Sequence, residues 1–182
     1  MLRYALVFSV GLAGLCLAAS SDPSNGWNSN LSWQTPAALQ AMDLSHNTKP
    51  IMYLFNQPWC GACKRLKETF QQEGDKISKL SQKFILVNVG GDDNSGFGEA
   101  FAPDGGYIPR ILFAEPSGTL RPDLKNPANQ KEYAYFYDSM DKVRAGMKNA
   151  LKLLGSQGKA ETSEQPAAAS ATSQTKPEVS EL

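Results

Sequence analysis

Two cysteines that lie three positions apart, Cys60 and Cys63, mark the point where the character of the chain changes. The residues before them, 51–55, read IMYLF, a continuous apolar run between proline-containing segments, which predicts a short buried strand ending in a turn. In residues 60–72 apolar positions recur at spacings of three and four between charged ones, which predicts an amphipathic helix. Cys60 is therefore expected where a loop from a strand enters the first turn of a helix.

Such a pair can be half of a metal site, a structural disulfide or a redox catalyst. A structural zinc site needs four ligands, whereas this chain offers one closely spaced pair and one histidine, His46, in a predicted loop. We therefore expect no metal. A disulfide that closes so short a loop removes little entropy from the unfolded chain, which makes a purely structural role weak. Redox chemistry is the favoured interpretation, and the other two stay as alternatives.

The predicted position of the pair suits thiol–disulfide exchange. The free N–H groups at a helix N-terminus stabilise negative charge, so they favour the thiolate of Cys60, which is the nucleophile in exchange. Lys64 can add a positive charge on the same side of the first turn and so tune this thiolate. Cys63, on the inward face, is placed to resolve a mixed disulfide. Gly61 and Ala62 are small and leave room for a partner sulfur, so we expect an accessible Cys60 and a shielded Cys63.

The two ends of the chain differ in character from its middle. Residues 1–20 combine Arg3 with an apolar run and then small residues, the pattern of a secretory signal peptide, and we expect no membrane span after its removal. Residues 155–182 are rich in Ala, Ser, Thr and Gln, which predicts a disordered tail. The final Glu181-Leu182 matches the end of a lumenal retention signal without the usual Lys-Asp before it. The endoplasmic reticulum lumen is the predicted location, with secretion as the alternative.

The length of 182 residues favours one domain with extensions, which we place at 33–154 after a short segment at 21–32. Lysine plus arginine and aspartate plus glutamate number 18 each, so the formal net charge is zero. A nucleic-acid-binding protein usually carries a basic excess, and we expect no nucleic-acid partner. Asn30 lies in an Asn-Leu-Ser sequon and is a possible glycosylation site.

Further elements are predicted along the domain. A helix is expected from Thr35-Pro36 to about residue 44, because threonine and proline are typical of a helix start. Strands are expected at 84–89 and 111–115, the latter with a hairpin partner near 119–120, and a last helix runs to 154 behind Asp138 or Ser139. This order predicts an α/β fold in which helices cover both faces of a mixed central sheet. The long loop at 90–107 is either functional or a solvated insertion.

At this point the residues resemble a family. WCGAC followed by lysine, together with DGGYIPR at 104–110, is similar to the thioredoxin-fold oxidoreductases. The closer resemblance is to small endoplasmic-reticulum members of the protein disulfide isomerase family that are related to the anterior-gradient proteins, and it runs from about 33 to 154. It implies a thioredoxin-like fold and a thiol–disulfide oxidoreductase that acts on cysteine-containing client proteins of the secretory pathway. It also implies glutathione as the redox partner and no bound cofactor.

The resemblance also assigns roles to residues. It implies that Cys60 attacks and Cys63 resolves, and that a cis Pro109 after Ile108 faces the pair and helps to hold a client chain, with Trp59 flanking it. Gly61 and Ala62 would complete this substrate-binding surface.

The chain departs from better-known thioredoxins at one position. They resemble one another in a buried acid six residues before the first cysteine, where this chain has Leu54, so proton transfer at Cys63 would need water or another group. Anterior-gradient relatives often lack the second cysteine, which this chain keeps. The competing class is a non-enzymatic chaperone or binding protein, because one fold serves many functions.

Overall fold

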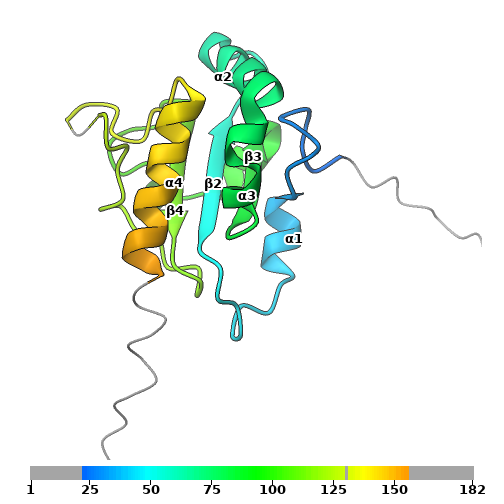
Figure 1. Ribbon diagram of the computed structural model, residues 1–182, viewed down its shortest axis with the longest axis vertical. Helices are drawn as coiled ribbons and strands as arrows, with labels where there is room; N and C mark the ends of the chain where they lie inside the picture. The colour runs from blue at the N-terminus through cyan, green and yellow to red at the C-terminus, as the bar shows by residue number, and fades with distance from the viewer. Residues whose placement is uncertain (1–21, 130, 156–182) are drawn as a thin grey trace, which may run out of the picture.

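The computed structural model describes residues 22–129 and 131–155 (Figure 1). The predicted signal peptide and nearly all of the predicted tail lie outside these ranges. A four-stranded sheet forms the centre of the described part, in the order β1-β3-β2-β4. Its strands are β1 (Trp33–Gln34), β2 (Ile51–Asn56), β3 (Ile85–Gly90) and β4 (Arg110–Ala114).

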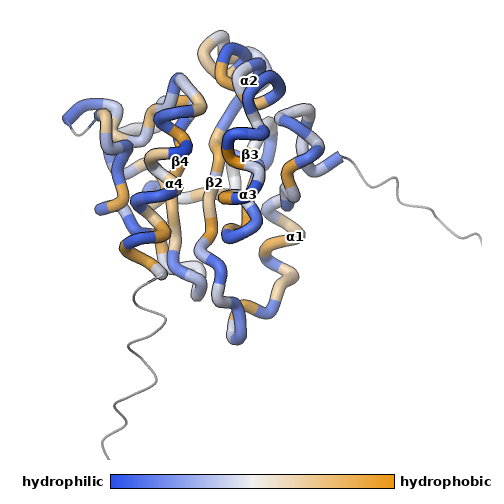
Figure 2. Tube along the Cα trace, in the orientation of Figure 1, coloured by the Kyte–Doolittle hydropathy of each residue, from blue (hydrophilic) through white to orange (hydrophobic). Residues whose placement is uncertain are grey.

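The sheet is mixed, as predicted. β3 pairs in parallel with both β1 and β2, and β4 pairs antiparallel with β2. In this register Tyr53 lies between Val87 and Leu112. The hairpin partner expected after β4 is reduced to a single bridge between Ala114 and Leu120. β2 and β3 are therefore the two interior strands, each hydrogen-bonded on both edges, and β2 is apolar along most of its length (Figure 2).

The α-helices are α1 (Pro36–Gln40), α2 (Gly61–Glu73), α3 (Ser78–Ser81) and α4 (Met140–Leu154). Thr35 caps α1 as predicted, since Ala38 N donates to its side-chain oxygen at 3.1 Å. The prediction that this helix continues to residue 44 is wrong. The Asp43 side chain accepts a hydrogen bond from Ser45 N at 2.9 Å, and such a local turn competes with helical hydrogen bonds. At the start of α4 the cap position is Ser139, although its side chain makes no capping hydrogen bond.

The described residues also form short 3-10 helices, namely η1 (Gly74–Ile77), η2 (Gly91–Gly96) and η3 (Glu99–Phe101). The sheet buries two apolar faces. On one face Leu54, Leu86 and Phe113 pack with residues of α2 and α4. Figure 1 shows α4 lying across this face in front of β4. On the other face Tyr53 and Val87 belong to a second cluster, which α1 and the segment with η2 and η3 cover.

Residues 22–32 pack onto α2 and extend the packed unit beyond the predicted domain start at 33. Trp27 is buried and meets Phe70 of α2 edge to face, with ring centroids 5.4 Å apart. Lys67 Nζ donates to the Asn25 carbonyl oxygen at 2.7 Å, and Asn28 Nδ2 donates to the Phe70 carbonyl oxygen at 2.8 Å. The segment is thus held to the helix that carries the two cysteines by apolar packing and by hydrogen bonds.

Gly146 in α4 permits a close approach of Tyr137, and this contact gives a stability prediction. A Cβ at Gly146 would lie 2.6 Å from the Tyr137 hydroxyl oxygen and 2.9 Å from Cε1 of its ring, which is fully buried. We expect Gly146→Ala to destabilise the fold by about 1–3 kcal/mol through overpacking, despite the better helix propensity of alanine. The free energy of unfolding in urea measures this.

Tyr137→Phe is the matched partner of that variant. The Tyr137 hydroxyl is buried and finds no hydrogen-bond partner among the described residues, so its removal is expected to be neutral or stabilising. In the double variant the phenylalanine should recover part of the loss caused by Gly146→Ala, because the closest clashing atom is gone. Strictly additive effects of the two substitutions would show that the contact does not set the cost.

Candidate functional site

Cys60 and Cys63 lie at the N-terminus of α2, at the end of the sheet toward which β2 runs (Figure 1). They form a disulfide, with their Cα atoms 5.2 Å apart. Cys60 is the cap residue of the helix, and its Sγ accepts a hydrogen bond from Cys63 N at 3.1 Å. One of the otherwise free amides of the first turn is therefore directed at the sulfur of Cys60, an arrangement that favours a thiolate there after reduction.

The two cysteines differ in exposure less than the sequence suggested. Cys63 is 2% exposed, as expected for a shielded residue, but Cys60 is only 7% exposed in this oxidised form. The prediction of a solvent-accessible Cys60 is therefore wrong for the disulfide state. One covering group is the Ile108 carbonyl oxygen, which lies 3.7 Å from Cys60 Sγ. A disulfide sulfur carries no proton, so this is a contact; a reduced Cys60 thiol could donate a hydrogen bond to the same oxygen.

The Ile108-Pro109 segment faces the cysteine pair, and its peptide bond is cis, which confirms that prediction. Pro109 is buried directly before β4, whereas Ile108 is half-buried and packs against both apolar clusters. Next to the pair, Trp59 is 75% exposed, an unusual state for so large an apolar side chain. The structure thus brings the cysteine pair and its neighbour Trp59 next to the Ile108-Pro109 segment, although 48 positions separate Cys60 from Ile108 in the sequence.

Arg110 anchors this segment, a feature that sequence reasoning missed. Its Nε donates to the Phe101 carbonyl oxygen at 2.9 Å and its Nη1 to the Tyr107 carbonyl oxygen at 2.8 Å. The guanidinium carbon lies 4.3 Å from the centroid of the Phe55 ring, a cation–π contact. Burial lowers the pKa of Arg110. A charged residue at the start of an otherwise apolar strand was the available signal, because a buried arginine needs specific partners.

Asp104 and Tyr107 fasten the same loop to the segment before α4. The Tyr107 hydroxyl donates to Asp104 Oδ2 at 2.8 Å and accepts from Tyr135 N at 2.9 Å. Ala134 N donates to Asp104 Oδ2 at 2.7 Å. Burial is the main cause that raises the pKa of Tyr107, so this hydroxyl stays protonated. The long loop at 90–107 is therefore hydrogen-bonded to the rest of the fold and supports Ile108-Pro109. These contacts argue against a merely solvated insertion.

A small cavity of about 170 Å³ opens beside Cys63. Its lining includes Trp27, Asn56, Lys64 and Lys67, and no carboxylate is among the residues around it. The Asn56 amide is held in place: its oxygen accepts from Trp27 Nε1 at 3.3 Å, and its nitrogen donates to the Asn88 side-chain oxygen at 2.8 Å. The polar side chains around this cavity beside Cys63 are therefore neutral amides and two lysines.

The remaining predicted residues are placed as follows. Leu54 is fully buried in the sheet, so the position of the buried acid of other thioredoxins is apolar here. Lys64 is exposed, and it lines the cavity beside Cys63. Gly61 is exposed and Ala62 half-buried between the cysteines, and Asn30 is exposed in a turn, where an enzyme could reach it.

Within 22–129 and 131–155, no group of three or more His, Cys, Asp or Glu side chains is arranged to hold a metal ion. In the same part of the chain, no helix combines the length and the apolar character that crossing a membrane requires.

Comparisons with known proteins agree with this architecture. A family model described as thioredoxin-like matches residues 30–116, and with the sheet topology it confirms the predicted thioredoxin-like α/β fold. The chain is 32% identical over 131 residues to the anterior gradient protein 2 homolog of Homo sapiens, covering 72% of this chain and 73% of that protein. It is 33% identical over 131 residues to anterior gradient protein 2-B of Xenopus laevis, covering 72% and 77%.

The chain is also 29% identical over 135 residues to anterior gradient protein 3 of Homo sapiens, covering 74% of this chain and 79% of that protein. A solved thioredoxin-fold protein from Helicobacter pylori matches with a TM-score of 0.37 at 14% identity, covering 71% of this chain and 99% of that one.

Proposed function

The chain belongs to the anterior gradient family of thioredoxin-like proteins, and from that premise we propose that it is a thiol–disulfide oxidoreductase acting on client proteins. The observation that carries the proposal is the placement of Cys60 at the cap of α2, with Cys63 N donating to its sulfur and the Ile108-Pro109 segment against it. A purely structural disulfide needs neither a helix N-terminus nor an opposing loop.

In the proposed exchange the reduced cysteine pair reduces a client disulfide in two steps. The Cys60 thiolate attacks one sulfur of a client disulfide, forms a mixed disulfide and releases the first client thiolate. The Cys63 thiolate then attacks Cys60 Sγ, releases the second client thiolate and forms the Cys60–Cys63 disulfide. The client gains two electrons and the protein loses two. Two glutathione molecules restore the dithiol and leave as glutathione disulfide, and the reverse sequence oxidises a client dithiol.

The surface around Cys60 is suited to an extended client chain. Trp59 offers an exposed aromatic face for apolar client side chains. Ile108 adds apolar surface next to the reacting sulfur, and Pro109 has no N–H that would compete for client carbonyl groups. Gly61 and Ala62 leave space for the client sulfur that Cys60 attacks, and Lys64 adds positive charge to the first turn of α2.

Proton transfer at Cys63 uses water in this proposal. No acid occupies position 54, and the cavity beside Cys63 has a volume of about 170 Å³, which is enough for several water molecules. Asn56, Lys64 and Lys67 line this cavity and would orient such water.

The cellular setting is part of the proposal as well. The motifs CGAC and DGGYIPR support a likeness to thioredoxin domain-containing protein 12, a small endoplasmic-reticulum member related to this family. The signal-peptide pattern of residues 1–20 and the final Glu181-Leu182 support action in the endoplasmic reticulum lumen. If the ending is not read as a retention signal, the same chemistry would occur in a secreted protein.

Turnover of a fluorescent peptide disulfide in a glutathione buffer tests the function. We expect the wild-type protein to accelerate exchange and Cys60→Ala to reduce the rate to that of the buffer alone. Trp59→Ala should raise KM for the peptide and leave exchange with a small-molecule disulfide nearly unchanged, because the indole contacts the peptide chain and not the sulfurs. A wild-type rate equal to that of the buffer would instead support the non-enzymatic binding protein.

A further inference from the structure

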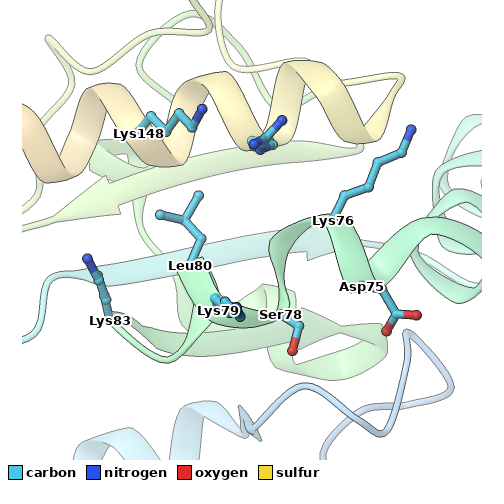
Figure 3. Close-up of a pocket in the computed structure, with 8 residues that line it drawn as sticks. Asp75, Lys76, Ser78, Lys79, Leu80, Lys83 and Lys148 are labelled. Atoms are coloured by element: carbon cyan, nitrogen blue, oxygen red, sulfur yellow. The ribbon is translucent and has the colours of Figure 1, made fainter.

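A second concave site lies between the η1–α3 segment and α4, away from the cysteine pair. It is a cavity of about 540 Å³, which we call the basic groove (Figure 3). Its lining contains five cationic side chains and one carboxylate: Lys76, Lys79, Lys83, Arg144, Lys148 and Asp75. In Figure 3 Lys148 projects from α4, Leu80 points toward α4 from the other wall, and Asp75 points away from it. Arg144 also belongs to α4 and lines the groove. None of these residues belongs to the candidate active site.

Within the part of the chain that the structure describes, four of the five cations in the basic groove have no acidic partner. Lys76 pairs with Glu73 at 2.6 Å and approaches Asp141 at 4.0 Å. No ion pair joins Lys79, Lys83, Arg144 or Lys148 to any of the residues that the structure describes. The whole chain has a formal net charge of zero, so this concentration of positive charge is local and is not a property of the surface in general.

The local structure keeps these cations together. Arg144 and Lys148 are one helical turn apart, about 6 Å along α4. Each directly follows a buried residue, Val143 or Met147, so the packing of α4 holds both cations on the same side of the helix. Lys79 of α3 and Lys83, which follows the end of that helix, lie on the opposite wall. Like charges gathered in one groove repel one another, so an anion placed between the two walls relieves an unfavourable arrangement.

We propose that the basic groove is a docking site for an acidic segment of a protein partner. Its volume is in the range of about 300–1,000 Å³ typical of ligand pockets, which is larger than one small anion needs. Lysine is a flexible point charge, which suits a row of carboxylates, whereas the specific recognition of phosphate favours the planar fork of arginine, and the groove has one arginine. The half-buried Leu80 offers apolar contact to the partner's backbone and side chains.

The probe for this site is a fluorescently labelled decaglutamate peptide, followed by anisotropy with the oxidised protein, and decaglutamine serves as the neutral control. We expect measurable binding of decaglutamate at 50 mM salt and weakening at 200 mM, because exposed charges are screened. The double variant Arg144→Glu/Lys148→Glu should lose at least about tenfold in affinity. Lys49→Glu/Lys131→Glu makes the same change in net charge elsewhere on the exposed surface and should lose less than about threefold.

Four results would overturn the proposal: no binding of decaglutamate, equal binding of decaglutamine, an equal loss in both double variants, or displacement of the peptide by inorganic phosphate at equal charge concentration. A fifth concerns the chain itself, whose residues after 155 include Glu161 and Glu164. If Glu161→Gln/Glu164→Gln in the full chain raised decaglutamate affinity tenfold, the tail would be the occupant, and the assignment to a partner would fail. None of these outcomes bears on the proposed exchange reaction of the cysteine pair, which has its own test.

Discussion

Replacement of Cys63 by alanine should turn the protein into a trap that stays covalently attached to its clients through Cys60. The first exchange step needs only Cys60, whose sulfur retains its place at the cap of α2, so the mixed disulfide still forms. Its resolution then depends on thiols from solution. An intramolecular thiol acts at an effective concentration far above the millimolar level of glutathione, so we expect resolution to slow by at least about a hundredfold.

The measurement is the fraction of protein in mixed disulfides with a cysteine-containing peptide, followed by non-reducing electrophoresis and mass spectrometry. The chain has a third cysteine, Cys16, within the predicted signal peptide, and it is replaced by serine in every variant so that only the pair can react. Cys60→Ala is the matched control, and it should form adducts at Cys63 far more slowly, because Cys63 is buried and lacks the cap position at which an amide favours the Cys60 thiolate. Faster adduct formation at Cys63 than at Cys60 would reverse the assigned roles.

Replacement of Arg110 by alanine is expected to cause the largest loss of stability among the variants considered. The carbonyl oxygens of Phe101 and Tyr107 lose their donors, and the Phe55 ring loses the cation above it. No carboxylate among the described residues pairs with Arg110, so its fold-stabilising contacts are these carbonyl groups and this ring. We expect a cost of about 2–4 kcal/mol and a fall in Tm of about 10 °C.

Two further arginine variants make this test specific. Arg110→Lys keeps the charge but not the fork that reaches two carbonyl groups, so its stability should fall between those of the wild type and Arg110→Ala. Arg144→Ala removes an exposed arginine and should change the free energy of unfolding by less than about 0.5 kcal/mol. A loss in Arg110→Ala no larger than that in Arg144→Ala would contradict the anchoring role.

The sequence was informative where one local pattern determines the structure. The apolar run before Cys60 and the periodic apolar positions after it predict β2 and α2, and the structure confirms both within a residue. The cis geometry before Pro109 is a different case, because no local rule requires it and the prediction depended on a family resemblance.

The parts that sequence reasoning missed depend on tertiary contacts. Trp27 lies among Asn, Ser and Gly residues without any periodicity, so its burial against α2 has no local signal. Phe97 and Phe101 lie in a glycine-rich segment, yet they pack edge to face on the rings of Tyr53 and Phe55. The basic groove combines cations from two segments about 60 residues apart, which only the packing of α3 near α4 brings together.

The most direct test of a redox function is the equilibrium of the Cys60–Cys63 disulfide with glutathione. The fraction of dithiol is measured by alkylation and mass spectrometry across a series of glutathione buffers, with Cys16 replaced by serine. We expect reversible titration with a potential within the range of exchange catalysts, from about −270 to −120 mV, because the cap amide stabilises the reduced thiolate. A pair that stays oxidised in every buffer, as structural disulfides below about −300 mV do, would contradict a catalytic role.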